Sequence, residues 1–149
     1  LIDPQMIDFL ATNMIEQTGL KVATLIRRIE DAADLSNPNV VKVVINRNNE
    51  AMYFSRQAIP FVRDFPVDSW LEHGVYYKHV GMYAYTSQAL MAIEKLHMHP
   101  YEALEKLEQL TWIAHGLSIE CYETNMESIG IDTEEDLKAV TSMIAELED

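Results

Sequence analysis

Apolar positions between residues 40 and 54 follow the pattern of a β-hairpin. One apolar run extends from Val40 to Ile45 and a second from Ala51 to Phe54. The segment between them, Asn46 to Glu50, is polar, and its asparagines favour a turn. Two runs rich in β-branched and aromatic residues around such a segment are typical of paired strands. We therefore predict an antiparallel hairpin at the centre of the fold.

The rest of the chain alternates between helical and strand patterns. Asp3 and Pro4 predict the start of a helix, because aspartate caps free amides and proline suits the first helical position. Further strands are predicted over residues 22–29, 75–85, 117–122 and 129–131, and further helices over residues 87–96, over residues 103–115 and from Thr133 onward. This alternation indicates an α/β fold.

The helix predicted over residues 103–115 has two stripes with helical spacing. Its apolar stripe, expected to face the core, is Leu104, Leu107, Leu110 and Ala114. The neighbouring stripe is Glu105, Glu108, Gln109 and Trp112. The polar residues of this second stripe are candidates for ligand binding, although most such pairs are simply solvated.

Length and composition exclude several classes of protein. The chain has 149 residues and a formal net charge of −13, with only 11 Lys and Arg residues. The length predicts one domain, and the charge argues against nucleic acid as a partner, because that binding needs a clustered basic surface. No run approaches the roughly 18 apolar residues of a membrane span. With one cysteine, Cys121, expected to be buried, we predict a cytoplasmic protein that binds neither nucleic acid nor membrane.

Arg56 and Arg63 follow the second hairpin strand and flank Pro60. Guanidinium groups bind carboxylates and phosphates bidentately, so this pair is a candidate clamp for a small anion. Arginine is mostly exposed in proteins, and two solvated side chains are the alternative. The spacing alone leaves both interpretations open.

His79, Tyr83 and Tyr85 have matched parity on the strand predicted over residues 75–85, so a regular strand projects them to one side. Such side chains can hydrogen-bond a polyhydroxy ligand, although aromatic residues on strands usually pack. His97 and His99 resemble a metal pair, but no third ligand stands at a recognised spacing, and we expect both to be structural.

Asp132 ends a predicted strand directly before a helix N-terminus. Ligands collect at the carboxyl ends of strands in open α/β sheets, and a carboxylate there can hold a hard divalent cation. The alternative is that Asp132 only stabilises the helix through its macrodipole.

An ordered set of segments adds a family resemblance to this pattern. They are residues 1–4, 38–44, 53–56 (YFSR) with 59–60 and 63–64, 78–85 (KHVGMYAY), 104–110 (LEKLEQL), and 131–133 with 135–137. In this order and at this spacing they resemble the C-terminal part of the CMP-Kdo synthetases, which are 3-deoxy-manno-octulosonate (Kdo) cytidylyltransferases.

The resemblance implies the C-terminal portion of a Rossmann-like nucleotidyltransferase, with a mixed sheet flanked by helices. It implies a Mg²⁺-dependent homodimer that transfers a cytidylyl group from CTP to Kdo, giving CMP-Kdo and pyrophosphate for lipopolysaccharide synthesis. The family's phosphate-cradling loop and its other metal aspartate have no counterpart here. We therefore expect residues 1–149 to be the sugar-binding and dimerisation part, without the N-terminal nucleotide-binding half and inactive alone.

Roles follow from the resemblance by motif position. The catalytic residues would be Arg56 and Arg63, the substrate-binding residues His79, Tyr83, Glu108 and Gln109, and the metal ligand Asp132. Thr111 departs from the family pattern, since many members have arginine there, and this leaves the sugar open: 8-amino-Kdo or another sugar acid is an alternative. A non-catalytic dimerisation module is the alternative from a different class.

Overall fold

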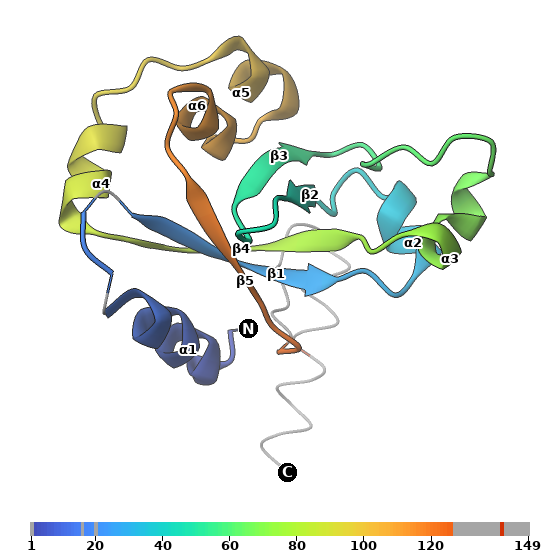
Figure 1. Cartoon of the computed structure of the whole chain (residues 1–149), viewed down its shortest axis with the longest axis horizontal. Helices are drawn as coiled ribbons and strands as arrows, with labels where there is room; N and C mark the ends of the chain where they lie inside the picture. The colour runs from blue at the N-terminus through green and yellow to red at the C-terminus, as the bar shows by residue number, and fades with distance from the viewer. Residues whose placement is uncertain (1, 16, 20, 127–140, 142–149) are drawn as a thin grey trace.

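The computed structural model describes residues 2–15, 17–19, 21–126 and 141. Its centre is a five-stranded sheet of order β3-β2-β4-β1-β5 (Figure 1). The strands are β1 (Val22–Arg28), β2 (Lys42–Ile45), β3 (Ala51–Ser55), β4 (Tyr77–Tyr85) and β5 (Ile119–Glu123). β1 and β5 are parallel, and the other neighbours are antiparallel. The mixed sheet and its flanking helices confirm the α/β class.

Helices cover both faces of this sheet. They are α1 (Pro4–Ile15), α2 (Ala32–Ser36), α3 (Trp70–His73), α4 (Ser87–Ile93), α5 (Pro100–Glu105) and α6 (Gln109–Ala114), with a 3₁₀ helix η1 (Val67–Ser69) before α3. α1 lies on one side of the sheet and α5 and α6 on the other, while α2 and α3 stand at one end of the molecule (Figure 1). The predicted cap of α1 is confirmed, because Asp3 Oδ1 accepts a hydrogen bond from the Gln5 amide at 2.9 Å.

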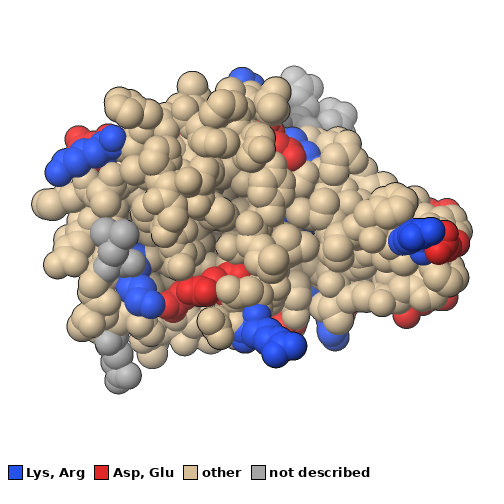
Figure 2. Space-filling view, turned by 45° about the horizontal axis from the view of Figure 1, so that its top comes forward, with Lys and Arg blue, Asp and Glu red and all other residues tan. Residues whose placement is uncertain are grey.

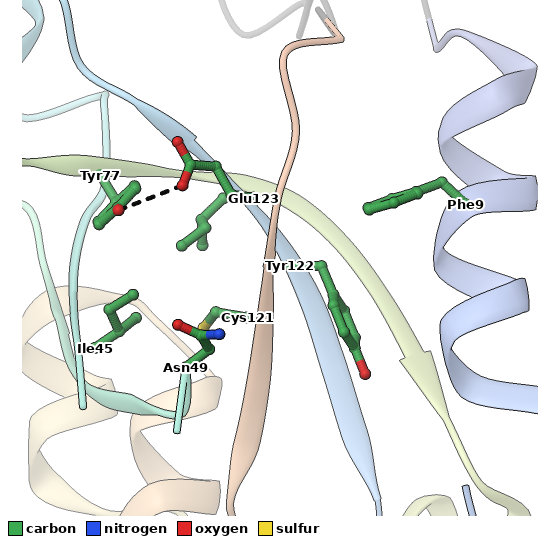
Figure 3. A pocket seen from close by; sticks show the side chains of 8 residues that line it. Phe9, Ile45, Asn49, Tyr77, Cys121, Tyr122 and Glu123 are labelled. Atoms are coloured by element: carbon green, nitrogen blue, oxygen red, sulfur yellow. Dashed lines mark hydrogen bonds between the residues drawn. The ribbon is translucent and has the colours of Figure 1, made fainter. Parts of the chain in front are cut away.

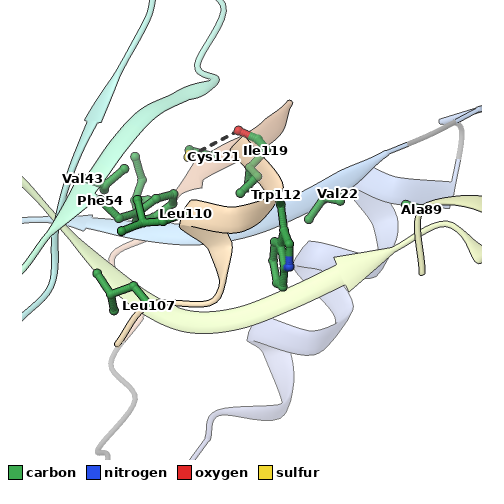
Figure 4. Packing of buried hydrophobic residues seen from close by; sticks show 10 residues of the cluster. Val22, Val43, Phe54, Ala89, Leu107, Leu110, Trp112, Ile119 and Cys121 are labelled. Carbon is green, nitrogen blue, oxygen red and sulfur yellow. Dashed lines mark hydrogen bonds between the residues drawn. The ribbon is translucent and has the colours of Figure 1, made fainter. Parts of the chain in front are cut away.

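β1 is buried on both faces over Val22–Ile26, which explains why Thr24 is the one polar residue of that segment. Val22 and Ile26 belong to a core cluster that includes Phe54, Leu107, Leu110 and Trp112, on the side of α4 and α6 (Figure 4). Ala23 and Leu25 point to the other face, where they pack against Met6 and Leu10 of α1. The two cores fix β1 between the helical layers.

The predicted hairpin is confirmed as β2 and β3. Asn46 holds its turn, since Oδ1 accepts hydrogen bonds from the Asn48 and Glu50 amides at 2.8 and 3.0 Å. Asn49 has a left-handed φ of 59°, a conformation that asparagine tolerates better than most residues. The asparagines of the sequence therefore form the turn for which they were predicted.

The single helix predicted over residues 103–115 is wrong. The chain forms α5 and α6 instead, separated at Lys106, which has a left-handed φ of 55°. Leu107 and Leu110 are buried as expected, but Leu104 is 79% exposed and Ala114 is exposed too, so the stripe as a whole does not face the core. The strand predicted over residues 129–131 and the helix from Thr133 lie outside the described residues.

Candidate functional site

A bulge in β4 positions His79 and Tyr83. Tyr83 pairs with Thr24 of β1, and His79 pairs with Ile26. The chain therefore advances four positions on β4 where it advances two on β1. Gly81 lies within the bulge with φ of 79°, a conformation that L side chains rarely adopt. Because the bulge adds two residues, the parity of β4 is preserved, and His79 and Tyr83 still face the same side.

Thr24 fixes the tautomer of His79. The Thr24 hydroxyl donates to the Met82 carbonyl at 2.7 Å and lies 2.9 Å from His79 Nε2. Since a hydroxyl has one proton to donate, Nε2 must carry the hydrogen, and Nδ1 is the acceptor nitrogen. Burial lowers the pKa of His79 from 6.5 to about 4, so the imidazole is neutral at pH 7.

Aromatic rings connect β4 to α6. The His79 ring lies 5.1 Å from the rings of Phe54 and Tyr83. Tyr83 in turn contacts Tyr85 at 5.9 Å and Trp112 of α6 at 5.1 Å. The edge-to-face contact with Trp112 is one that aromatic pairs favour, and it holds α6 against the strand.

The phenol oxygen of Tyr83 is buried and unpaired. Within the described part of the chain it is the one buried side-chain oxygen or nitrogen with no hydrogen-bond partner. Burial raises the pKa of Tyr83, and the negative charge of Glu108 adds to the rise. Burial and then the negative charge of Glu108 likewise raise the pKa of Tyr85.

The structure brings His79 and Tyr83 together on β4. The contact between Tyr83 and Trp112 holds α6 against this strand, and Glu108 and Gln109 stand at the start of that helix. Glu108 is exposed, whereas Gln109 is only 5% exposed. A neutral imidazole, a phenol, a carboxylate and an amide form a group of donors and acceptors suited to a hydroxyl-rich ligand.

Arg56 is part of a hydrogen-bonded network at the end of β3. Its Nε donates to the Glu105 carbonyl at 2.8 Å, and its Nη1 donates to the Pro38 carbonyl at 3.0 Å. Arg63 lies in the segment after β3, which runs to the α2 and α3 end of the molecule (Figure 1). Its side chain is 88% exposed and pairs with neighbouring Asp64 at 3.6 Å. These contacts do not join the two arginines into one clamp.

The predicted metal ligand, Asp132, lies outside the described residues. Residues 2–15, 17–19, 21–126 and 141 contain no group of three or more His, Cys, Asp or Glu side chains that could hold a metal ion. His99 has a structural role, as expected, because it caps α5 by accepting a hydrogen bond from the Tyr101 amide at Nδ1. The Mg²⁺ site stays a prediction.

Sequence reasoning missed the roles of Thr24 and Lys42. Lys42 is fully buried, and its Nζ donates to the carbonyls of Asn37 and Val40 at 2.8 and 2.5 Å. Each residue interrupts an apolar run as its one polar member within Val22–Ile26 or Val40–Ile45. That interruption is the available signal, because a buried polar group needs a specific partner.

A separate cavity of about 220 Å³ lies between the hairpin turn and β5 (Figure 3). It is lined in part by Asn49, Cys121 and Glu123, and Tyr77 donates a long hydrogen bond of 3.4 Å to Glu123 across it. None of the predicted site residues lines it. Cys121 is 3% exposed, and burial raises the pKa of its thiol to about 12, which confirms the expected small buried residue.

The face drawn in Figure 2 is mostly uncharged, and its Lys and Arg side chains are scattered rather than clustered. None of the helices in the described part of the chain has the length and apolar content that crossing a lipid bilayer requires.

Comparison with known proteins agrees with the resemblance. A family model described as cytidylyltransferase matches residues 1–128. The 3-deoxy-manno-octulosonate cytidylyltransferase of Cytophaga hutchinsonii is 45% identical over 141 residues, which are 94% of this chain and 56% of that protein. The enzyme of the same name from Parabacteroides distasonis is 40% identical over 148 residues, which are 97% of this chain and 59% of that protein.

A solved structure of CMP:2-keto-3-deoxy-manno-octonic acid synthetase complexed with CTP is similar in fold. It aligns with a TM-score of 0.85 and 36% identity, covering 97% of this chain and 57% of that one. The chain thus spans just over half the length of these relatives, and the expectation that it corresponds to their C-terminal part is not confirmed by these matches. On the match of residues 1–128 and the identity to these relatives, the chain belongs to the cytidylyltransferase family.

Proposed function

We propose that this chain is the sugar-acid-binding part of a CMP-Kdo synthetase. In the reaction, the anomeric hydroxyl oxygen of Kdo bonds to the α-phosphorus of CTP, the bond to pyrophosphate breaks and the hydroxyl proton is released. The product, CMP-Kdo, would serve lipopolysaccharide synthesis in the cytoplasm. Nucleotide binding is assigned to the portion of the relatives' length that this chain does not span.

The observation that carries the proposal is the unpaired Tyr83 phenol. Native proteins rarely leave a buried hydroxyl without a partner, because each one costs about 1–3 kcal/mol. Tyr83 Oη is such a group, its ring lies against the His79 ring, and the negative charge of Glu108 adds to the rise of its pKa that burial causes. A sugar hydroxyl or carboxylate bound between these residues would complete its hydrogen bonding.

Each residue has a defined part in binding. His79 Nδ1 and Glu108 accept hydrogen bonds from sugar hydroxyls, while Tyr83 and Gln109 donate. Arg56 faces the sugar carboxylate as the cationic partner that an acid requires. The proposed roles of Arg63 toward the phosphates and of Asp132 toward Mg²⁺ rest on the resemblance alone.

The test measures pyrophosphate release from CTP and Kdo in the presence of Mg²⁺. We expect no turnover by the 149-residue chain and turnover once it is extended to the full length of its relatives. Turnover by the chain alone would refute its assignment as one part of the enzyme. No turnover by a folded extended protein, with Kdo or 8-amino-Kdo, would refute the reaction itself.

The alternative, a dimerisation module without a ligand, is favoured by exposed apolar side chains on β3 and α5. Met52 is 60% exposed, Tyr101 51% and Leu104 79%, and exposed apolar side chains can mark interfaces. A homodimer through α5 is compatible with both functions. Calorimetric titration with Kdo separates them, because the module predicts no binding heat, whereas the enzyme part predicts binding that is lost in His79→Ala.

A further inference from the structure

Glu105, the last residue of α5, is hydrogen-bonded to the end of β3 at three points. Its Oε1 accepts a hydrogen bond from Ser55 Oγ at 2.6 Å, and its Oε2 accepts one from the Arg56 amide at 2.9 Å. Its backbone carbonyl accepts the third, from Arg56 Nε at 2.8 Å. One residue therefore fixes both the backbone and the guanidinium of Arg56.

The other side of the Arg56 guanidinium is also fixed. Nη1 donates to the Pro38 carbonyl, in the loop whose Asn37 and Val40 carbonyls bind buried Lys42. Burial lowers the pKa of Lys42, and the Glu105 charge opposes that effect. Arg56 and Lys42 thus both donate to carbonyls of the same loop, residues 37–40.

The same residue connects Arg56 to the start of α6. After Glu105 the chain turns through left-handed Lys106 and buried Leu107, and then reaches Glu108 and Gln109. Residues three and four positions beyond Glu105 thus carry the carboxylate and the amide of the candidate sugar site. A shift of Glu105 would displace Arg56 and α6 relative to each other.

We infer that Glu105 is a positioning residue that orients Arg56 toward the carboxylate of a sugar acid and sets its distance from Glu108 and Gln109. This inference rests on the proposed function. Two of the three guanidinium nitrogens of Arg56 donate to backbone carbonyls, which fix the orientation of the guanidinium. The direction of the third nitrogen, Nη2, is therefore set by the fold. Such pre-orientation lowers the entropy lost when an anion binds.

The test compares Glu105→Gln with Glu94→Gln, an exposed glutamate that serves as the matched control. Glutamine keeps an oxygen that can accept from the Arg56 amide and an amide group that can donate to Ser55 Oγ, but it removes the charge, so the bond to the Arg56 amide is no longer charge-assisted. Measured in the extended protein, the KM for Kdo should rise about tenfold while the KM for CTP stays within twofold, as expected for the loss of a charge-assisted hydrogen bond. Glu94→Gln should change neither.

A double-mutant cycle decides whether Glu105 acts through Arg56. If it does, Glu105→Gln should raise the KM for Kdo no further once Arg56→Ala is present. Additive effects of the two substitutions, or an unchanged KM for Kdo in Glu105→Gln, would overturn the inference while leaving the proposed function intact. If Glu105→Gln fails to fold, Glu105→Asp, which keeps the charge but cannot reach both donors, takes its place in the cycle. Absence of turnover in the unsubstituted extended protein would instead refute the proposed function.

Discussion

His79 is the residue that most directly links the stability of this fold to pH. Its pKa is about 4 in the folded chain, against 6.5 for an ordinary histidine. The unfolded chain therefore binds a proton between these values that the folded chain does not, and the free energy of unfolding falls as the pH drops from 6.5 to 4. The full shift corresponds to about 3 kcal/mol.

Urea unfolding at pH 7 and pH 4.5 measures this loss. Because other groups also titrate in this range, the informative quantity is the difference between the unsubstituted chain and His79→Gln, which cannot gain the proton. We expect His79→Gln to lose less stability on acidification, whereas His73→Gln, at an exposed position, should behave like the unsubstituted chain. Equal losses in all three proteins would contradict the pKa assigned to His79.

Tyr83 offers a second test at the residue scale, in which stability and binding change in opposite directions. Tyr83→Phe removes a buried hydroxyl that has no partner, so the free energy of unfolding should rise by about 1 kcal/mol. The same substitution removes a donor from the candidate site and should weaken Kdo binding about tenfold in the extended protein. Chemical unfolding and calorimetry give the two values, and a stabilised variant with unchanged Kdo affinity would mean that the phenol has no part in binding.

At the scale of elements, the β2–β3 hairpin depends on the side chain of Asn46. Asn46→Ala deletes two hydrogen bonds to turn amides and a third from Nδ2 to Glu50 at 2.8 Å. We expect a loss of about 1–2 kcal/mol in the free energy of unfolding. Asn48→Ala, at an exposed position of the same turn, is the control and should cost less than about 0.5 kcal/mol. Similar losses in the two variants would show that the Asn46 side chain does not hold the turn.

Several elements were predictable because their signals are local. The hairpin follows from two apolar runs around an asparagine-rich segment, and β1 from an apolar run interrupted only by Thr24. The break between α5 and α6 was not predictable, because nothing in the sequence near Lys106 disfavours a helix. At the break, Glu105 accepts hydrogen bonds from Ser55 and Arg56, two residues that are distant from it in the sequence.

At the scale of the whole molecule, Cys121 reports on unfolding. It is the one cysteine of the chain and lies in the main core cluster. Its pKa of about 12, against 9.0 for an ordinary thiol, leaves about a thousandfold less thiolate at pH 8. We expect iodoacetamide to modify the native chain slower by that factor than the urea-unfolded chain. Rapid modification of native protein would show that β5 opens without global unfolding.

The sequence predicted those features of the candidate site that depend on neighbouring residues, but not those that depend on contacts between distant residues. The parity of His79 and Tyr83 survives because the bulge at Gly81 adds two residues. Glu108 and Gln109 were recognised as a polar stripe, and the fold brings them to β4 through Trp112. Arg56 and Arg63 are close in sequence, yet Arg56 donates to the Glu105 carbonyl whereas Arg63 pairs with Asp64.

The sequence by itself determined the α/β class, the hairpin, the positions of most strands along the chain and the family. These properties depend on periodicity and on ordered motifs, and both are contained in short stretches of the chain. Only the tertiary structure decided where α5 ends, which tautomer His79 adopts, that the Tyr83 phenol is unpaired and how Arg56 is held. Each of these depends on contacts between residues tens of positions apart, such as Thr24 with His79 and Arg56 with Glu105, and such contacts form only when the sheet brings distant strands and helices together.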